Sequence, residues 1–151
     1  MIESMAAIAA ELQADHAFLA RLPRANAAQF VQARTCYDHF AGQFGVTLLR
    51  GFMAAGWLHA EKSEYRLTLA GETGFSKFGV DLANARSQCR VFARACADVS
   101  ERSPHLGGAL AAAFLDACIC QGLVLRSRQS RIVHVTPSGW DALRQAGLLP
   151  P

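Results

Sequence analysis

Several patterns that would indicate an enzyme are absent from this sequence of 151 residues. No glycine-rich loop follows a predicted strand, so a phosphate-binding loop is not expected. Cys36 and His39 resemble a thiol and its base, but no oxyanion hole or orienting third group accompanies them. No two of the candidate carboxylates are spaced as a general acid and base; these candidates are Glu61, Glu64, Glu72 and Glu101. We therefore expect a protein that is not an enzyme and that requires no cofactor.

The sequence also lacks a segment that would span a membrane. Its longest apolar run, residues 106–115, is shorter than the roughly 18 residues that cross a bilayer. Acidic Glu3 and Glu11 stand where a secretory signal would be basic, so we expect a cytoplasmic protein with reduced thiols. The five cysteines form no CxxC pair, and the spacing therefore gives no support for a zinc ribbon or finger.

What the sequence does contain is a repeat. The stretch Arg34–Gly42 (RTCYDHFAG) returns in altered form over residues 94–108, with Cys96, Asp98 and His105 in the places of Cys36, Asp38 and His39. Each copy leads into an apolar segment that ends at a glycine, Gly56 or Gly122, and then into two short alternating segments. The chain is therefore expected to use one structural unit twice.

Hydrophobic periodicity predicts mostly helical structure within an α+β class. Residues 2–20 carry an apolar stripe at helical spacing, which predicts a helix that either forms a homodimer or docks on its own domain. Residues 26–55 are predicted to form one long helix; a helix-turn-helix with its turn at residues 45–46 is the alternative. Further helices are predicted over residues 81–97, 104–121 and 138–146.

Two β-hairpins are predicted, each directly after a glycine that ends a helix. The first covers residues 57–68 and the second covers residues 123–136. A long helix, a small hairpin and a short helix in that order are typical of a winged-helix unit. The predicted architecture is a dimerisation helix at residues 1–25 followed by two tandem winged-helix-like halves, 26–80 and 81–151, in one compact unit.

The repeated cysteine and histidine are the strongest candidates for ligand binding. If the repeat reflects symmetry, Cys36 and His39 face Cys96 and His105, and together such groups bind zinc, copper or arsenite. Two alternatives stay open: a redox-responsive thiol or small-molecule pocket, and a purely structural role. In the structural interpretation the cysteines fill the core, and local ion pairs form in each copy, from Arg34, Asp38, Arg94 and Asp98.

Basic residues make nucleic-acid contact a further hypothesis. The formal charge is +3, and the predicted hairpins carry candidate phosphate contacts at Lys62, Arg66, Arg126, Arg128 and Arg131. The helices that would read bases are poorly suited, since residues 46–55 offer only Thr47 and Arg50 as polar groups. The predicted winged-helix units therefore lack a face that reads DNA.

Residues 34–46 (RTCYDHFAGQFGV) resemble a segment that follows the DNA-binding domain in long members of the ArsR, or arsenic-repressor, family of bacterial transcription regulators. Residues 94–108 resemble the same family, and the likeness covers about residues 30–147. One position departs from the family pattern, because Val99 stands where an aromatic residue, usually tryptophan, is expected. The resemblance therefore does not support a ligand-binding role for the loop that contains Val99.

The resemblance implies a regulatory, dimerising and effector-sensing domain, with the DNA-reading winged helix upstream of residue 1. The cysteines that bind arsenic in the arsenic sensors belong to that upstream domain, so the resemblance does not assign arsenic as the effector. The alternative is a stand-alone module that binds a metal or small ligand through Cys36, His39, Cys96 and His105 and does not contact DNA.

Overall fold

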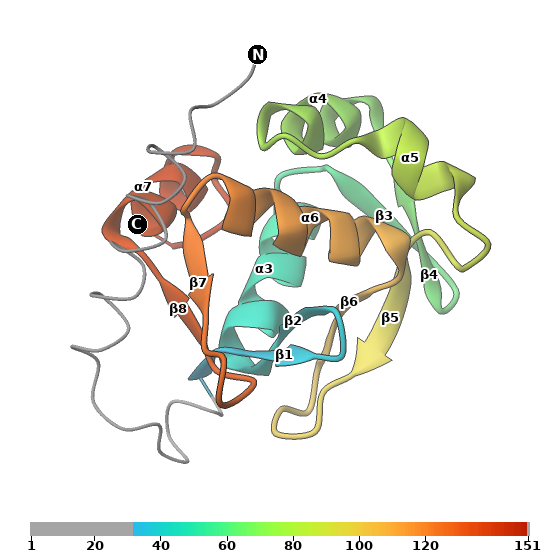
Figure 1. Ribbon diagram of the computed structural model, residues 1–151. Helices are drawn as coiled ribbons and strands as arrows, with labels where there is room; N and C mark the ends of the chain where they lie inside the picture. The colour runs from blue at the N-terminus through green and yellow to red at the C-terminus, as the bar shows by residue number, and fades with distance from the viewer. Residues whose placement is uncertain (1–31, 151) are drawn as a thin grey trace.

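The computed structural model describes residues 32–150, which form a mixed α+β fold. Within these residues it contains five helices and three small antiparallel sheets, two with two strands and one with four. Helices α3 and α6 lie in the centre, with the four-stranded sheet on one side and the pair β7–β8 on the other (Figure 1). The dimerisation helix predicted for residues 2–20 lies outside the described residues.

The elements follow one another in the same order twice. The first copy, residues 34–77, comprises β1 (Arg34–Cys36), β2 (His39–Ala41), α3 (Gly42–Ala54), β3 (Leu58–Glu61), β4 (Glu64–Leu67) and α4 (Leu69–Lys77). The second copy, residues 94–145, comprises β5 (Arg94–Ala97), β6 (Pro104–Gly107), α6 (Ala109–Cys120), β7 (Val124–Arg126), β8 (Val133–Val135) and α7 (Pro137–Gln145). Helix α5 (Leu82–Ser87) connects the copies.

The start of each copy is a hairpin, where the sequence predicted helix. The long helix over residues 26–55 is wrong, because residues 34–41 pair as β1 and β2 and α3 begins only at Gly42. The alternative turn at residues 45–46 is also wrong, since α3 runs through both. The helix predicted for 81–97 ends at Ser87, and the one predicted for 104–121 begins at Ala109 after strand β6. Helical spacing misled in the first copy because nearly all residues of β1 and β2 are buried, which removes the alternation of apolar and polar residues that indicates a strand.

Glycines end the two central helices, as the sequence predicts. Gly56 and Gly122 adopt φ values of +75° and +69° just after α3 and α6, a conformation that favours glycine. The short helices α4 and α7 are preceded by the N-cap residues Thr68 and Thr136, whose hydroxyls accept the backbone N–H three residues further on. Each N-cap threonine therefore ends a hairpin and starts a helix at the same point.

Each copy forms backbone hydrogen bonds with the edge strand of the other copy. Strand β4 of the first copy pairs with β5 of the second, where Tyr65 N–H donates to Ala93 O and Ala95 N–H to Ser63 O. The corresponding bonds join β8 to β1: Val133 N–H donates to Ala33 O and Thr35 N–H to Arg131 O. The second hairpin of each copy, β3–β4 or β7–β8, thus continues the opening hairpin of the other copy, β5–β6 or β1–β2. The two opening hairpins therefore lie close together at the centre.

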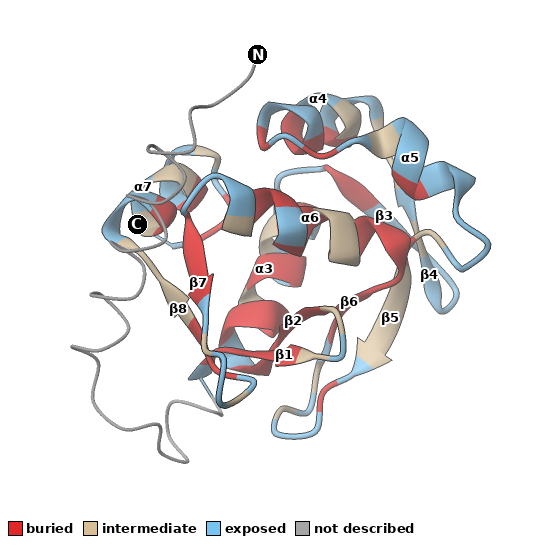
Figure 2. Cartoon of the chain, viewed as in Figure 1, coloured by how far each residue is buried: buried red, intermediate tan, exposed pale blue. Residues whose placement is uncertain are grey.

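Aromatic and aliphatic side chains of α3, α6 and α4 form a single core. Phe114 of α6 lies against Phe52 of α3 and Phe75 of α4, with ring centroids 5.3 and 5.7 Å apart. Figure 2 shows that both central helices are largely buried. In the described part of the chain, no helix is long and apolar enough to cross a membrane.

Candidate metal centre

Both hairpins place a cysteine directly opposite a histidine. Cys36 on β1 pairs with His39 on β2, and Cys96 on β5 pairs with His105 on β6. Directly opposite residues in antiparallel strands share one face of the sheet, so each hairpin presents its sulfur and its imidazole together. One ligand atom from each of these four residues lies within 4.8 Å of every other. The structure therefore brings together the four residues that the repeat singled out.

A chain of four side chains crosses the boundary between the copies. The Nε2 atoms of His39 and His105 are 3.0 Å apart. The Nδ1 atom of His39 lies 3.1 Å from Oδ1 of Asp38, and that of His105 lies 2.7 Å from Oδ2 of Asp98. Each copy contributes one aspartate–histidine pair, and the two pairs meet at the histidines.

Burial controls the protonation of this cluster. His39 and His105 are 2% and 1% exposed, and burial lowers the pKa of both imidazoles against the opposing effect of their aspartates. The pKa of the Cys36 thiol is raised by burial and then by the neighbouring Cys96 thiol, while Arg131 and Arg34 act in the opposite direction. The uncharged forms of the histidines and of Cys36 are therefore favoured in the absence of a bound cation.

The arginines of the cluster form long-range ion pairs, which corrects the local pairs predicted from sequence. Arg34 binds Asp98 at 2.9 Å rather than Asp38, and Asp38 binds Arg90 at 2.6 Å. The predicted pairing of Arg94 with Asp98 is not found in the described residues. The predicted pairs assumed that both segments were helical, whereas hairpins direct these side chains across the boundary. Nothing in the repeat signals Arg90, because it lies outside both copies.

Asp98 connects the cluster to the N-terminus of α3. Its Oδ2 accepts the backbone N–H of Gly42, the first residue of that helix, at 2.8 Å. Its Oδ1 accepts from Arg34 and from the backbone N–H groups of Ser100 and Glu101. Burial opposes ionisation of Asp98, yet these hydrogen bonds and the one from His105 hold its pKa well below the ordinary value. Asp98 is therefore a buried carboxylate that remains charged.

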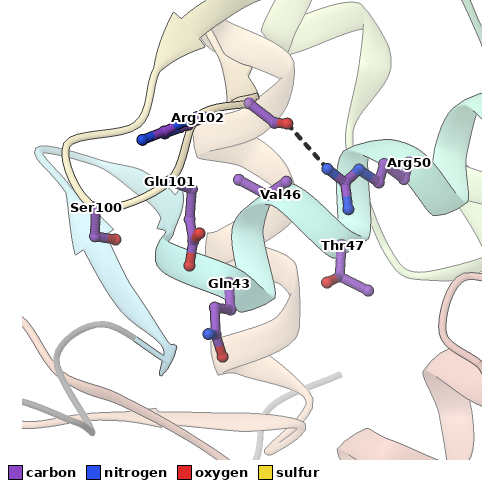
Figure 3. A pocket seen from close by; sticks show the side chains of 8 residues that line it. Gln43, Val46, Thr47, Arg50, Ser100, Glu101 and Arg102 are labelled. Atoms are coloured by element: carbon purple, nitrogen blue, oxygen red, sulfur yellow. Dashed lines mark hydrogen bonds between the residues drawn. The ribbon is translucent and has the colours of Figure 1, made fainter.

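A polar cleft of about 630 Å³ lies on the outer side of α3, beneath the loop that follows Asp98. Figure 3 shows Gln43, Thr47 and Arg50 on the helix and Glu101 and Arg102 on the loop, with Glu101 directed toward the helix near Gln43. Arg50 donates to the Ser103 hydroxyl at 2.9 Å, and Oε1 of Glu101 is buried without a hydrogen-bond partner in the described structure. The cleft is lined by none of the four cysteine and histidine residues of the cluster.

The candidate phosphate contacts are dispersed over the hairpins β3–β4 and β7–β8. Lys62 lies exposed in the β3–β4 turn and Arg66 lies exposed on β4, where it pairs with Glu61 at 3.2 Å. Arg126, Arg128 and Arg131 lie exposed on or between β7 and β8, and Arg131 is also close enough to affect the Cys36 thiol. Helices α3 and α6 are mostly buried, so neither presents a continuous polar face.

The chain is similar to one curated helix-turn-helix regulator. Over 107 residues it is 37% identical to the "Uncharacterized HTH-type transcriptional regulator YdfF" of Bacillus subtilis (strain 168). The match covers 71% of this chain and 47% of the relative, so the chain spans about half the length of that protein. The name of the relative identifies a transcriptional regulator and does not mention the arsenic-repressor family. No family model and no solved structure matches the chain.

Proposed function

We propose that this chain is the regulatory domain of an ArsR-type transcription regulator, that it acts in the cytoplasm, and that it is not an enzyme. The observation that carries this proposal is its similarity to a helix-turn-helix regulator of which it spans about half. In this proposal a helix-turn-helix domain outside the described residues reads the DNA. The hairpin residues Lys62, Arg66, Arg126, Arg128 and Arg131 add at most phosphate contacts.

Burial of the central helices supports a regulatory rather than a DNA-reading role. A reading helix must present Arg, Asn, Gln or similar groups to the major groove. Helix α6 exposes Asp116 and Cys120, and its neighbour Gln121 bonds to Phe78 O. Helix α3 exposes Gln43, Arg50 and Met53, but Arg50 is bonded to Ser103. Neither helix is suited to enter a groove in this fold, whose two copies we interpret as winged-helix-like units.

In this proposal the effector binds at the boundary between the two copies, where it contacts Cys36, His39, Cys96 and His105. The segment at residues 2–20 forms the homodimer, as its apolar stripe predicts. Removal of residues 1–20 is expected to give a monomer by light scattering. A truncated chain that stays dimeric would assign dimerisation to another surface.

The regulatory role is tested with a reporter fused to the promoter of the gene's own operon. Deletion of the gene is expected to change reporter expression at least several-fold, and the full-length coding sequence is expected to restore it. A matched control carries the same sequence with an early stop codon. Unchanged expression with and without the gene, over a range of added metals, would reject a regulatory role at that promoter.

The convergence of two cysteines and two histidines also favours a second candidate, a stand-alone sensor that never contacts DNA. A gel shift with the purified full-length protein and the same promoter DNA separates the two. The regulator is expected to bind in a manner that weakens steeply with salt. A stand-alone sensor is expected to give no shift, while it still binds its ligand.

A further inference from the structure

The hydrogen bonds of the two histidines leave two acceptor atoms facing each other. A carboxylate only accepts hydrogen bonds, so Nδ1 of each histidine must carry the proton that it donates to Asp38 or Asp98. In the neutral imidazole the lone pair then lies on Nε2. The two Nε2 atoms are 3.0 Å apart, and the two side chains are 3% and 1% exposed. Two acceptors at this distance repel each other unless a cation lies between them.

The surrounding atoms show which kind of cation fits. The sulfur atoms of Cys36 and Cys96 lie within 4.8 Å of each other and of one nitrogen of each imidazole ring. A tetrahedral zinc ion, with bonds of about 2.3 Å to sulfur and about 2.0 Å to nitrogen, spaces its ligand atoms roughly 3.3–3.8 Å apart. The four groups therefore need only small shifts to enclose one ion: the two Nε2 atoms separate slightly, and pairs of ligand atoms that are wider than this spacing move closer. Sulfur and imidazole ligands do not suit magnesium or calcium, which prefer oxygen.

We infer that Cys36, His39, Cys96 and His105 bind one divalent transition-metal ion of the zinc type in a closed tetrahedral site. On binding, the two S–H bonds break, their protons pass to solvent, and two metal–sulfur bonds form. All four positions are filled by the protein, so no position remains for a substrate. Asp38 and Asp98 are positioning residues, because each holds the ring of its histidine with Nε2 directed at the ion.

The ion joins the two copies, since each copy supplies one cysteine and one histidine. Asp98 links His105 to the N-terminus of α3 and to the loop over the polar cleft. Occupancy of the site therefore fixes the opening hairpins relative to each other and relative to α3. That this occupancy controls transcription rests on the proposed function, whereas the metal site itself does not.

The test is a titration of the purified, reduced and metal-stripped full chain with Co²⁺, followed by Zn²⁺. We expect one Co²⁺ per chain, with the intense visible absorption of a tetrahedral ion and a thiolate-to-cobalt charge-transfer band in the near ultraviolet. Zn²⁺ is expected to displace the cobalt and abolish both signals. This measurement involves no DNA, so loss of the regulatory role would leave its result unchanged.

Matched variants assign the ligands. Cys36→Ser combined with Cys96→Ser is expected to abolish the charge-transfer band, whereas Cys89→Ser combined with Cys120→Ser, which changes two exposed thiols, is expected to leave it unchanged. Asp38→Asn and Asp98→Asn are each expected to lower zinc affinity about 10- to 100-fold while keeping one ion per chain. Circular dichroism of each variant reports whether it has folded.

Three results would overturn the inference, and the first two need no variant. One is a wild-type chain that shows no charge-transfer band and retains no zinc, which would leave only a proton shared by the histidines. Another is a wild-type chain that binds no metal and forms a Cys36–Cys96 disulfide on exposure to air, as measured by mass spectrometry. The third is undiminished cobalt binding in the folded double variant at Cys36 and Cys96.

Discussion

Asp38 in the first copy and Asp98 in the second hold equivalent histidines in different surroundings. Asp38 lies in the two-residue turn between β1 and β2, with 29% of its side chain exposed, and pairs with Arg90. Asp98 begins a six-residue loop between β5 and β6, is fully buried, and accepts hydrogen bonds from Arg34, Gly42, Ser100, Glu101 and His105. The longer loop thus gives one copy a buried, fully bonded carboxylate that the other copy lacks.

This difference teaches that the two halves of the cluster have separate roles. The second copy supplies Asp98, whose carboxylate binds the N-terminus of α3 and the loop over the cleft. This carboxylate therefore has a structural role. The first copy supplies Asp38, which is partly exposed and bonds to Arg90 and His39, and also Arg34, which binds Asp98. The carboxylate of the first copy is therefore the more exposed of the two, while its arginine belongs to the buried network.

The largest expected effect comes from comparing the two aspartates in the metal-free chain. Asp98→Ala leaves Arg34 buried without its carboxylate and should lower the free energy of unfolding by about 3–5 kcal/mol. Asp38→Ala removes a partly exposed pair with Arg90 and the acceptor of the buried His39 Nδ1–H, and should cost less, about 1–2 kcal/mol. Urea unfolding with a chelator present measures both. Equal losses of unfolding free energy in the two variants would show that burial gives Asp98 no larger contribution to stability than Asp38.

A smaller effect distinguishes the central helices at high pH. Burial raises the pKa of Cys118 on α6 to about 12, whereas Phe52 occupies the corresponding position on α3 and does not titrate. Below about pH 9 the thiol is protonated in both the folded and unfolded states, and stability is unaffected. Between about pH 9 and 12 only the unfolded state loses the proton, so stability should fall by up to about 1.4 kcal/mol per pH unit.

The check is the pH dependence of urea unfolding for the wild type and for Cys118→Ala. The variant is expected to lose stability less steeply above pH 9, because it lacks this thiol. Parallel slopes for the two proteins would show that Cys118 is not the group that titrates. Cys120→Ala, at an exposed position on the same helix, serves as the matched control.

The smallest effect is expected where the copies are most alike. Thr68 and Thr136 accept the backbone N–H of Gly71 and Gly139, each at 3.0 Å, and bond to the carbonyls that follow α3 and α6. Thr68→Ala and Thr136→Ala should each cost about 1 kcal/mol in thermal or urea unfolding. A much larger loss for one of them would show that the short helices contribute unequally.

The repeat in the sequence predicted the order of helix, hairpin and short helix in each copy, because glycine and threonine signal those boundaries locally. It also singled out Cys36, His39, Cys96 and His105 as residues that face each other. The opening hairpins were not predicted. The turn between β1 and β2 is Tyr37-Asp38, which is not a typical turn sequence, and Tyr37 adopts a φ of +62° that is uncommon for tyrosine.

The partners in the ion pairs could not be predicted from the sequence for a related reason. Arg34 contacts Asp98 only because the opening hairpins of the two copies lie side by side. The two residues are far apart in the sequence, so no local spacing predicts this contact. Arg90 lies outside the repeat altogether, in a segment predicted as helix that is irregular in the structure. Contacts made between copies depend on the three-dimensional arrangement, which a single sequence does not contain.

The hydrogen bonding between edge strands of the two copies has a consequence for folding. Neither copy can satisfy the backbone groups of its opening hairpin alone, since β1 needs the segment before β8 and β5 needs β4. A single copy expressed by itself would expose two unpaired strand edges, which are sites of aggregation. Residues 32–150 are therefore expected to fold as one cooperative unit, in which the segment before the last strand of the chain pairs with the first strand.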